Sequence, residues 1–474
     1  MPTVELTPPV LQQLDAFRGI VGDAHVYVDP EVLSAYASDE TEDLHFLPDV
    51  VLKPRTAEEI SRILSICNAH RIPVTPRGAG TGLSGGALPH LGGVLLSLER
   101  MNSILHIDER NLQVTTEPGV ITEVLQNAVR EKGLFYPPDP SSRGSCMIGG
   151  NIAENSGGPK AVKYGVVKDY VLNLELVLPT GEIIWTGANV LKNATGYNLT
   201  QLIVGSEGTL GVVTKIVLKL LPHPQHDLLM LVPFRSAEKA CAAVSAIFRA
   251  GYTPSAMEFM ERDALEWVMR FVDNSIVPIG EDVVAHLLIE VDGNDMDVLL
   301  KDMEGIAAIV QDYDCSDILF ADDAQQKEQL WKLRRRVGEA VKSNSVYKEE
   351  DTVVPRAELP LLLAGVKRIG ARYGFHSVCY GHAGDGNLHV NIIKGDLSDE
   401  AWNGSLKEGI REIFMLVKEL GGTISGEHGI GLVQKEYLPI VFDDVQLRLM
   451  RQIKQIFDPN GILNAGKIFD PETL

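Results

Sequence analysis

The spacing of hydrophobic residues from about Leu47 onward alternates between the period of a strand and the period of a helix. The apolar run VVLKP predicts a strand, and Thr56 with Glu59 has the capping-box spacing that starts a helix. The apolar positions that follow recur on one helical face: Ile60, Ile63, Leu64 and Cys67. This stretch therefore predicts a β-α-β opening.

Strand-like segments then dominate up to about Pro222. They read PVTPRG, VLLSL, LQVTTEPG and VLNLELVLPTGEIIWTG, and the last has a Pro-Thr-Gly turn typical of a hairpin. Glycine is dense throughout this region. We expect a first domain over residues 1–222, with its core over about 47–222.

Beyond residue 223 the strands alternate with longer amphipathic helices, such as AEKACAAVSAIFRAG and MDVLLKDMEGIAAIVQ. This order predicts an antiparallel sheet faced by helices, and hence an α+β second domain over residues 223–474. The last segment, IKQIFDPNGILNAGKIF, contains the loop-forming sequences Asp-Pro-Asn-Gly and Asn-Ala-Gly-Lys. Residues from about 425 to 474 are thus candidates to fold back on the first domain rather than build a core of their own.

Length, charge and cysteine content limit which partners and cellular compartments this chain is expected to have. A chain of 474 residues exceeds the usual size of one hydrophobic core, which agrees with two domains. The net charge of −21 would repel a phosphate backbone, so nucleic acid is not expected as a partner. Five scattered cysteines without CxxC spacing suit a reduced cytoplasmic chain. MPTVELTPPV lacks the features of a signal peptide, and no apolar run is long enough to span a membrane.

The loop PRGAGTGLSGGA contains a literal GxGxxG at Gly80, Gly82 and Gly85. A dinucleotide fingerprint of this type needs a helix directly after the glycines, whereas Pro89 and two further glycines interrupt the segment that follows. Dense glycines still expose a run of backbone N–H groups that suits phosphate. The alternative is a flexible surface loop.

Two further segments have a similar composition: residues 137–165 and 193–213. In this order and spacing, the three segments resemble the flavin-binding domain of the vanillyl-alcohol oxidase and p-cresol methylhydroxylase superfamily. The resemblance implies FAD. Covalent members carry a histidine on the first loop where this chain has Thr81, so noncovalent FAD is implied.

By this resemblance, the expected flavin contacts lie on the three segments and on one residue near the C-terminus. They are Pro76, Arg77, Gly78, Ala79, Gly80, Thr81, Gly82, Ser84, Gly85, Pro138, Asp139, Gly149, Gly150, Asn151, Asn155, Gly157, Gly158, Glu207, Gly211, Val212 and Asn464.

The stretch YGHAGDGNLHVNI places His382 and His389 on either side of a Gly-Asp-Gly turn. Two such histidines could be satisfied polar residues near the end of a sheet. The segment GGTISGEHGIG adds Glu427 and His428 in a glycine-flanked turn. If the two loops converge, His382, His389 and Glu427 form a two-histidine, one-carboxylate set that suits Zn, Mn, Fe(II) or Co.

The two motifs GHAGDGNLHVN and SGEHGIG resemble the C-terminal half of the FAD-linked D-2-hydroxyacid dehydrogenases, a group that includes D-lactate and D-2-hydroxyglutarate dehydrogenases and the glycolate oxidase flavoprotein subunit. The resemblance implies a divalent metal, zinc first and manganese or iron as alternatives, on His382, His389 and Glu427. It also implies that His428 is the catalytic base and that Asn391 contacts the substrate.

The segment LWKLRRRVGEAVKSNSVYKEED lies in the second domain, and its simplest interpretation is a solvated basic helix followed by a strand. We keep that interpretation for Arg335 and Arg336. The resemblance places carboxylate-binding residues at Arg334 and Lys348, and an arginine fork suits a carboxylate. The hydroxyglutarate enzymes have a threonine where this chain has Gly338, which leaves the side-chain end of the substrate open.

These observations predict a two-domain FAD enzyme that oxidises a D-2-hydroxyacid to a 2-oxoacid, with a hydride passing to the flavin. The alternatives are a flavin oxidase that uses dioxygen and a noncatalytic electron-carrier subunit of a larger complex. The electron acceptor could be an electron-transfer flavoprotein, a quinone or an iron–sulfur subunit. A partner could also bring the otherwise cytoplasmic chain to a membrane surface.

Overall fold

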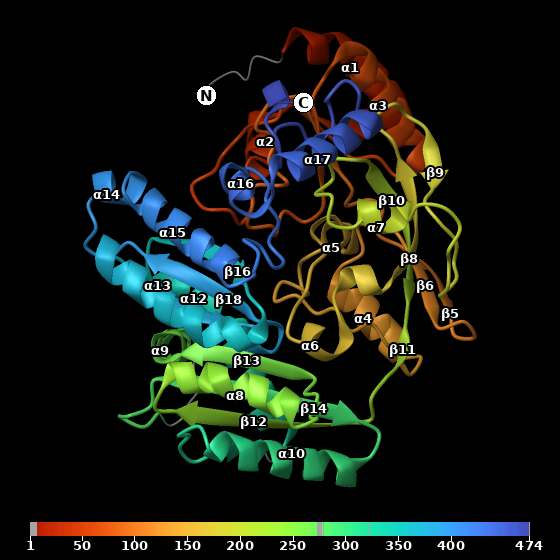
Figure 1. Ribbon diagram of the computed structural model, residues 1–474. Coiled ribbons are helices and arrows are strands. Elements are labelled where there is room, and N and C mark those ends of the chain that lie inside the picture. The colour runs from red at the N-terminus through yellow and green to blue at the C-terminus, as the bar shows by residue number, and fades with distance from the viewer. Residues whose placement is uncertain (1–6, 273–276, 278, 322, 474) are drawn as a thin grey trace. The chain divides into compact units, whose positions relative to one another are not determined.

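The computed structural model describes residues 7–272, 277, 279–321 and 323–473 (Figure 1). Residues 1–6, which begin the stretch examined for a signal peptide, lie outside the described residues. The chain forms two compact units. Unit 1 comprises residues 1–156, 166–223 and 427–474, and unit 2 comprises residues 157–165 and 224–426.

Unit 1 opens with a four-stranded sheet in the order β1-β2-β4-β3, in which β2 and β3 run parallel to β4 and β1 runs antiparallel to β2. Its strands are β1 (Val26–Tyr27), β2 (Val50–Leu52), β3 (Val74–Arg77) and β4 (Val94–Ser97). Helices α1 (Pro8–Val21) and α3 (Ala57–His70) pack together and share one hydrophobic core with this sheet.

Helix α3 begins as the sequence predicts, with one difference. The Glu59 N–H donates to Thr56 Oγ1 at 3.2 Å, but the Glu59 carboxylate accepts from the Arg55 N–H at 2.6 Å rather than from Thr56. The cap is therefore formed by Thr56, and Glu59 extends it by one residue. The four apolar residues predicted for one face are all fully buried.

A second sheet of unit 1 is antiparallel, in the order β5-β6-β10-β8-β9. Its strands are β5 (Ile104–Asp108), β6 (Gln113–Thr116), β8 (Val171–Val177), β9 (Ile183–Trp185) and β10 (Val212–Lys219). The predicted hairpin is confirmed, because β8 pairs with β9 across the Pro-Thr-Gly turn. β7 (Leu134–Phe135) and β11 (Leu221–Pro222) form a short antiparallel pair.

Short helices complete unit 1: α2 (Pro30–Ala35), α4 (Thr122–Arg130), α5 (Ile148–Glu154), α7 (Leu199–Ile203), α16 (Leu438–Val441) and α17 (Asp444–Phe457). The chain forms no helix between β3 and β4, so the glycine loop there is not a Rossmann turn, as predicted. Across both units, 3-10 helices occupy Asp23–His25, Val167–Asp169, Arg356–Glu358, Ala383–Asp385, Lys435–Tyr437 and Pro471–Thr473.

The C-terminal segment from residue 427 onward is an integral part of unit 1. The Val74 N–H donates to the Ile462 carbonyl at 2.8 Å, and the Asn464 N–H donates to the Val74 carbonyl at 2.8 Å. The Leu432 N–H donates to the carbonyl of Ser84 in the glycine loop, also at 2.8 Å. These backbone bonds attach the end of the chain to β3 and to the loop that follows it.

Unit 2 is built on a seven-stranded, fully antiparallel sheet in the order β15-β12-β14-β13-β17-β18-β16. Its strands are β12 (His226–Phe234), β13 (Ala256–Glu261), β14 (Ala285–Gly293), β15 (Leu319–Phe320), β16 (Tyr347–Val353), β17 (His376–Gly381) and β18 (Asn387–Ile393). The predicted antiparallel sheet faced by helices is confirmed.

Helices cover both faces of this sheet (Figure 1). One face packs against α9 (Arg262–Phe271), α11 (Ala324–Arg335) and α12 (Val337–Asn344) through a shared apolar core. The other face carries α8 (Ala237–Arg249), α10 (Met296–Gln311), α13 (Leu359–Tyr373) and α15 (Leu406–Glu419), with α14 (Asp399–Asn403) against α15. None of the helices that the described residues form is long and apolar enough to cross a membrane.

Residues 157–165, which the sequence analysis assigned to the first domain, belong to unit 2 and contain α6 (Ala161–Tyr164). Lys160 forms an ion pair with Glu290 of β14, and the Lys163 ammonium donates to Asp292 at 2.6 Å. The Tyr164 hydroxyl also donates to Asp292, at 2.8 Å. These contacts bind the end of the second glycine-rich segment to the unit 2 sheet.

Candidate active site

One face of the unit 2 sheet gathers polar and titratable side chains from neighbouring strands. Side chains alternate between the two faces of a strand, and the register pairs Tyr380 with His389 and His389 with Asp351. The same register and alternation place the following residues on that face, which also packs against α11: Glu258, Glu290, Glu349, Asp351, Tyr380, His389 and Asn391. The sheet therefore presents several carboxylates and an imidazole on one face.

The two predicted histidines lie next to one another. His382 follows β17 and His389 lies within β18, on either side of a turn closed by Gly386 in the left-handed conformation. Their ring centroids are 5.6 Å apart with an interplanar angle of 80°, and each offers a ring nitrogen within 4.8 Å of the other's. Both side chains are buried. The short hairpin brings two potential ligands within reach of one cation.

A fully buried carboxylate, Glu258, supports His382. The His382 Nδ1 lies 3.0 Å from Glu258 Oε1 and 2.9 Å from Oε2. The Arg334 Nη2 lies 2.7 Å from the same Oε2. Sequence analysis did not single out Glu258, because nothing in the sequence of β13 indicates that its carboxylate meets a histidine more than a hundred residues away.

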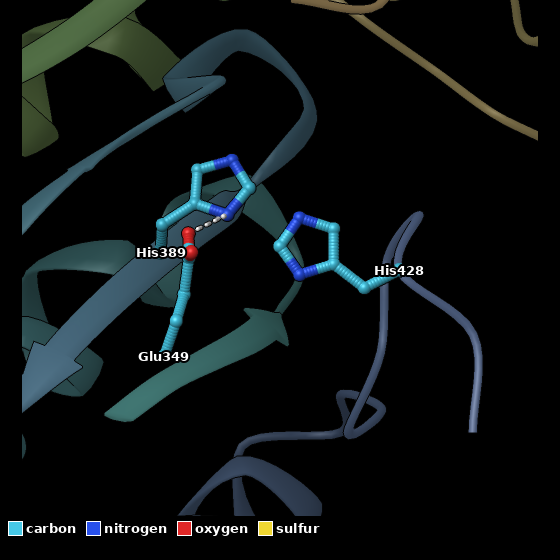
Figure 2. Close-up of side chains that lie close together, drawn as sticks. All are labelled: Glu349, His389 and His428. Atoms are coloured by element: carbon cyan, nitrogen blue, oxygen red, sulfur yellow. Dashed lines mark ion pairs between the residues drawn. The ribbon is translucent and has the colours of Figure 1, made fainter. Parts of the chain in front are cut away.

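His389 has an acidic environment on the strand beside it. Figure 2 shows its ion pair with Glu349 of β16, in which Nδ1 and Oε1 are 3.5 Å apart. The Tyr380 hydroxyl donates to the same Glu349 oxygen at 3.3 Å. Burial first, and then the negative charge of Glu349, raise the pKa of Tyr380 well above its ordinary value, so this hydroxyl remains protonated. Glu349 is a second carboxylate near His389 that the sequence analysis did not identify.

Asp351, on the edge strand β16, anchors the turn that precedes Glu427. One Asp351 oxygen accepts from the Gly426 N–H at 2.7 Å and from Ser425 Oγ at 3.1 Å, while the other accepts from the Asn387 amide at 2.6 Å. Gly426 is the last residue of unit 2. Glu427 and His428 follow it directly in the chain and belong to unit 1; Figure 2 labels His428.

Arg334, the predicted carboxylate-binding arginine, is buried on α11 and lies with its guanidinium carbon 5.2 Å from the centroid of the Tyr380 ring. Its Nε has no hydrogen-bond partner among the residues that the structure describes. Arg335 stacks on Trp331, and Arg336 pairs with Glu339 at 2.8 Å on a partly exposed surface. Of the three arginines, Arg334 is the one whose whole side chain is buried, and it pairs with Glu258 on the polar side of the sheet.

Lys348 is not brought together with the other predicted substrate residues. It pairs with Ile392 in the register, one position out of step with Glu349 and His389, so its side chain leaves the opposite face of the sheet. There its ammonium lies 5.0 Å from the centroid of the Trp402 ring and donates to the Trp402 carbonyl at 3.4 Å. Asn391, by contrast, is fully buried on the polar face. The alternation of YKEED along β16 was the signal that could have separated Lys348 from Glu349.

The glycine loop of unit 1 has the features that a dinucleotide phosphate requires. The backbone N–H groups of residues 79–82 find no acceptor among the described residues, so a run of donors is available to an anion. Gly80 has a φ of +73°, and a Cβ there would collide with the Arg77 guanidinium. Gly149 lies so close to Pro118 that a Cβ would be 2.6 Å from the proline Cβ. These residues fit a large ligand that approaches the backbone closely, as FAD does.

Several predicted flavin residues have structural contacts that hold the loops in place. The buried Arg77 guanidinium donates to the Ser38 carbonyl at 2.8 Å. Glu207 accepts from the Ile430 and Gly431 N–H groups at 2.8 and 2.7 Å, and the Asn464 amide donates to the carbonyls of Gly86 and Glu207. These bonds connect the first loop, the third segment and the C-terminal segment within unit 1. Gly157 and Gly158 instead belong to unit 2.

Two titratable groups beside these loops were missed by sequence reasoning. Burial first, and then the charge of Glu207, raise the pKa of Glu154 well above its ordinary value, which favours the neutral acid. Burial lowers the pKa of Lys467 to about 7, against the opposing effects of Asp39 and Glu207. No local pattern marks either residue, because each shift depends on contacts made far along the chain.

Comparison with known proteins identifies two family matches along the chain. The family described as "FAD binding domain" matches residues 48–187, and that described as "FAD linked oxidases, C-terminal domain" matches residues 223–468. The chain is 42% identical to glycolate oxidase subunit GlcD of Bacillus subtilis, with 92% of each chain covered. It is 38% identical to a D-lactate dehydrogenase of Anaerostipes hadrus, with 89% of each covered.

Among solved structures, p-cresol methylhydroxylase with substrate bound has a TM-score of 0.80 at 18% identity, covering 100% of this chain and 99% of that one. At that identity the likeness shows the fold alone. The predicted α+β fold, with a p-cresol methylhydroxylase-type flavin-binding domain, is confirmed.

Proposed function

Because this chain belongs to the FAD-linked oxidases, and is a flavoprotein oxidoreductase of the D-2-hydroxyacid dehydrogenase type, we propose that it oxidises a small D-2-hydroxyacid in a reaction that depends on a divalent metal. Glycolate and D-lactate are the first substrate candidates, since the two relatives described above carry those names. The product would be the corresponding 2-oxoacid.

The observation that carries the metal requirement is the pairing of His382 with His389 inside unit 2. The Nδ1 of His382 faces a carboxylate, which leaves its Nε2 as the nitrogen that can ligate. Chain connectivity supports Glu427 as the third ligand, because it directly follows Gly426, whose N–H is bound to Asp351 beside His389. The donor set of two imidazoles and a carboxylate fits zinc first, with manganese or iron as alternatives.

We assign the following roles to residues of this chain. Arg334, whose Nε has no hydrogen-bond partner among the described residues, would bind the substrate carboxylate. The buried amide of Asn391 would help to orient the substrate. An imidazole nitrogen of His428 would accept the proton of the substrate hydroxyl as the bond between the alpha carbon and its hydrogen breaks. When bound, the cation would lower the pKa of that hydroxyl, and FAD would accept the hydride with its electron pair.

The glycine loop, the second segment and Asn464 would hold FAD without a covalent bond, because Thr81 stands where covalent relatives have histidine. We propose that the electrons then leave for an acceptor outside the chain, such as an electron-transfer flavoprotein, a quinone or an iron–sulfur subunit. The name of the Bacillus subtilis relative, a glycolate oxidase subunit, favours a partner protein.

Metal analysis tests this proposal. We expect one divalent cation per chain in the purified protein, lost together with turnover in His382→Ala and in His389→Ala while FAD stays bound. FAD content serves as the control, since both histidines lie in unit 2 and the flavin loops lie mainly in unit 1. Full turnover after exhaustive chelation, with residual metal near zero, would contradict the proposal.

A further inference from the structure

Glu258 lies where a metal ligand and the predicted substrate arginine meet. Its carboxylate is within hydrogen-bond distance of His382 Nδ1 and forms an ion pair with Arg334 Nη2. The Glu258 side chain is fully buried. A buried carboxylate without partners would be costly, so these contacts account for its presence on β13.

For His382, the contact determines which ring nitrogen carries the hydrogen. A carboxylate can only accept, so Nδ1, at 2.9 Å from Oε2, must be the donor. In a neutral imidazole the other nitrogen, Nε2, then has a free lone pair. Carboxylates that hold a histidine in this way orient the ring and increase its basicity toward a metal.

For Arg334, the contact fixes one end of the guanidinium. Its Nη2 is held at 2.7 Å by Glu258, whereas its Nε remains without a protein partner among the described residues. The same carboxylate thus neutralises the buried arginine and determines where its remaining donors lie. An arginine held in this way loses little conformational freedom when it binds an anion.

We propose that Glu258 is a positioning residue that sets His382 for metal binding and Arg334 for binding of the substrate carboxylate. The inference rests on the proposed function and deepens it, because one side chain connects the metal ligand His382 to Arg334, the arginine proposed to bind the substrate carboxylate. It predicts that loss of the Glu258 charge weakens both metal and hydroxyacid binding, although Glu258 itself touches neither.

Glu258→Gln in the full-length, FAD-loaded protein tests the proposal. The metal dissociation constant, measured with zinc in competition with a chromophoric chelator, should rise by about 10- to 100-fold. At saturating zinc, the KM for the hydroxyacid should still rise because Arg334 is no longer held. In an Arg334→Met background, the same Glu258→Gln change should raise KM little further, since the guanidinium that binds the substrate carboxylate is already absent.

Glu261→Gln is the matched control. Glu261 lies on the same strand but on the opposite face, where it accepts from the Lys367 ammonium at 2.8 Å and from the Cys379 N–H at 2.7 Å. Its loss should lower the melting temperature without changing the affinity for zinc. An effect of Glu258→Gln on zinc affinity that Glu261→Gln reproduces would overturn the positioning role.

If Glu258→Gln does not retain FAD or a folded spectrum, Glu258→Asp replaces it in the test. The shorter side chain keeps the charge that Arg334 needs but withdraws the oxygens from His382, so zinc affinity should still fall. Parental zinc affinity in a folded Glu258 variant would overturn the inference alone. Failure of the parental protein to bind zinc or another divalent cation would overturn the proposed function as well, so the two failures are distinguishable.

Discussion

His428 is the residue on which the proposed proton transfer depends. It follows Glu427 in a turn whose preceding residue, Gly426, is held by Asp351 and whose following residues, Ile430 and Gly431, are held by Glu207. Each anchor restricts the backbone next to the turn within its own unit. A general base needs such restriction, because it must stay within hydrogen-bond reach of the proton that it accepts.

We therefore expect His428→Asn to slow flavin reduction by about 10²- to 10⁴-fold, because asparagine keeps some hydrogen bonding but cannot accept the proton. Rapid mixing under anaerobic conditions would measure the reduction rate. Flavin and metal contents should be unchanged, and they serve as the controls. Reduction at the parental rate would show that the base lies elsewhere in the chain.

For single residues, the sequence motifs pointed to the histidines, and the family resemblance added Asn391 and selected Arg334 rather than its two neighbours as a candidate. It could not identify Glu258 or Glu349, since their importance depends on which strand lies beside which. Lys348 is the candidate that the sheet register separates from the others. Its residue type suits a carboxylate, but its register position directs it to Trp402 on the other face of the sheet.

The glycine loop between β3 and β4 is the element that decides whether flavin binds. Gly80 occupies the left-handed region, and its Cα faces the Arg77 guanidinium that ties the loop to Ser38. A side chain at this position would be strained and would displace the arginine. The loop would then lose the arrangement of its free backbone N–H groups.

Gly80→Val should accordingly abolish flavin binding, and the ratio of flavin to protein absorbance in the purified variant measures the loss. Gly19→Val is a suitable control, because a Cβ at Gly19 on α1 would have no atom of the described residues within 4 Å. The control should bind a full complement of FAD. A yellow, stoichiometric Gly80→Val protein would refute the role of the loop.

The sequence predicted these elements well where the signal was local. The interrupted segment after the GxGxxG excluded a Rossmann helix, and the period-2 pattern gave the β8–β9 hairpin. It gave no sign that residues 157–165, which follow the flavin segment in the chain, belong to the second compact unit, where Lys160 and Lys163 hold them to β14. Ion pairs over such a sequence separation leave no local periodicity to read.

For the whole molecule, the absence of a histidine at the Thr81 position has a simple consequence. Acid precipitation of the purified protein should release all of its flavin into the supernatant, because Thr81 offers no imidazole to which the flavin could be covalently bonded. The yellow colour of the supernatant and a colourless pellet would measure this. Flavin that stays with the washed pellet would contradict noncovalent binding.

The two-unit architecture was the part of the fold most accessible from sequence, since five separated motifs in order resemble one family. The substrate is less accessible, because Gly338 replaces the threonine of the hydroxyglutarate enzymes. A Cβ at Gly338 would lie 3.2 Å from the Tyr380 hydroxyl, next to Arg334. The identity of the substrate's side-chain end therefore depends on packing around Tyr380, which sequence patterns do not describe.

Anaerobic bleaching of the bound flavin tests the central claim most directly. The purified, metal-replete protein would be mixed without oxygen with glycolate, D-lactate, L-lactate, D-2-hydroxyglutarate or D-malate, and the flavin absorbance followed, with dithionite as the control for full reduction. We predict that at least one D-2-hydroxyacid or glycolate reduces the flavin and that L-lactate does not. A flavin that dithionite reduces but that no hydroxyacid of this panel bleaches would contradict it.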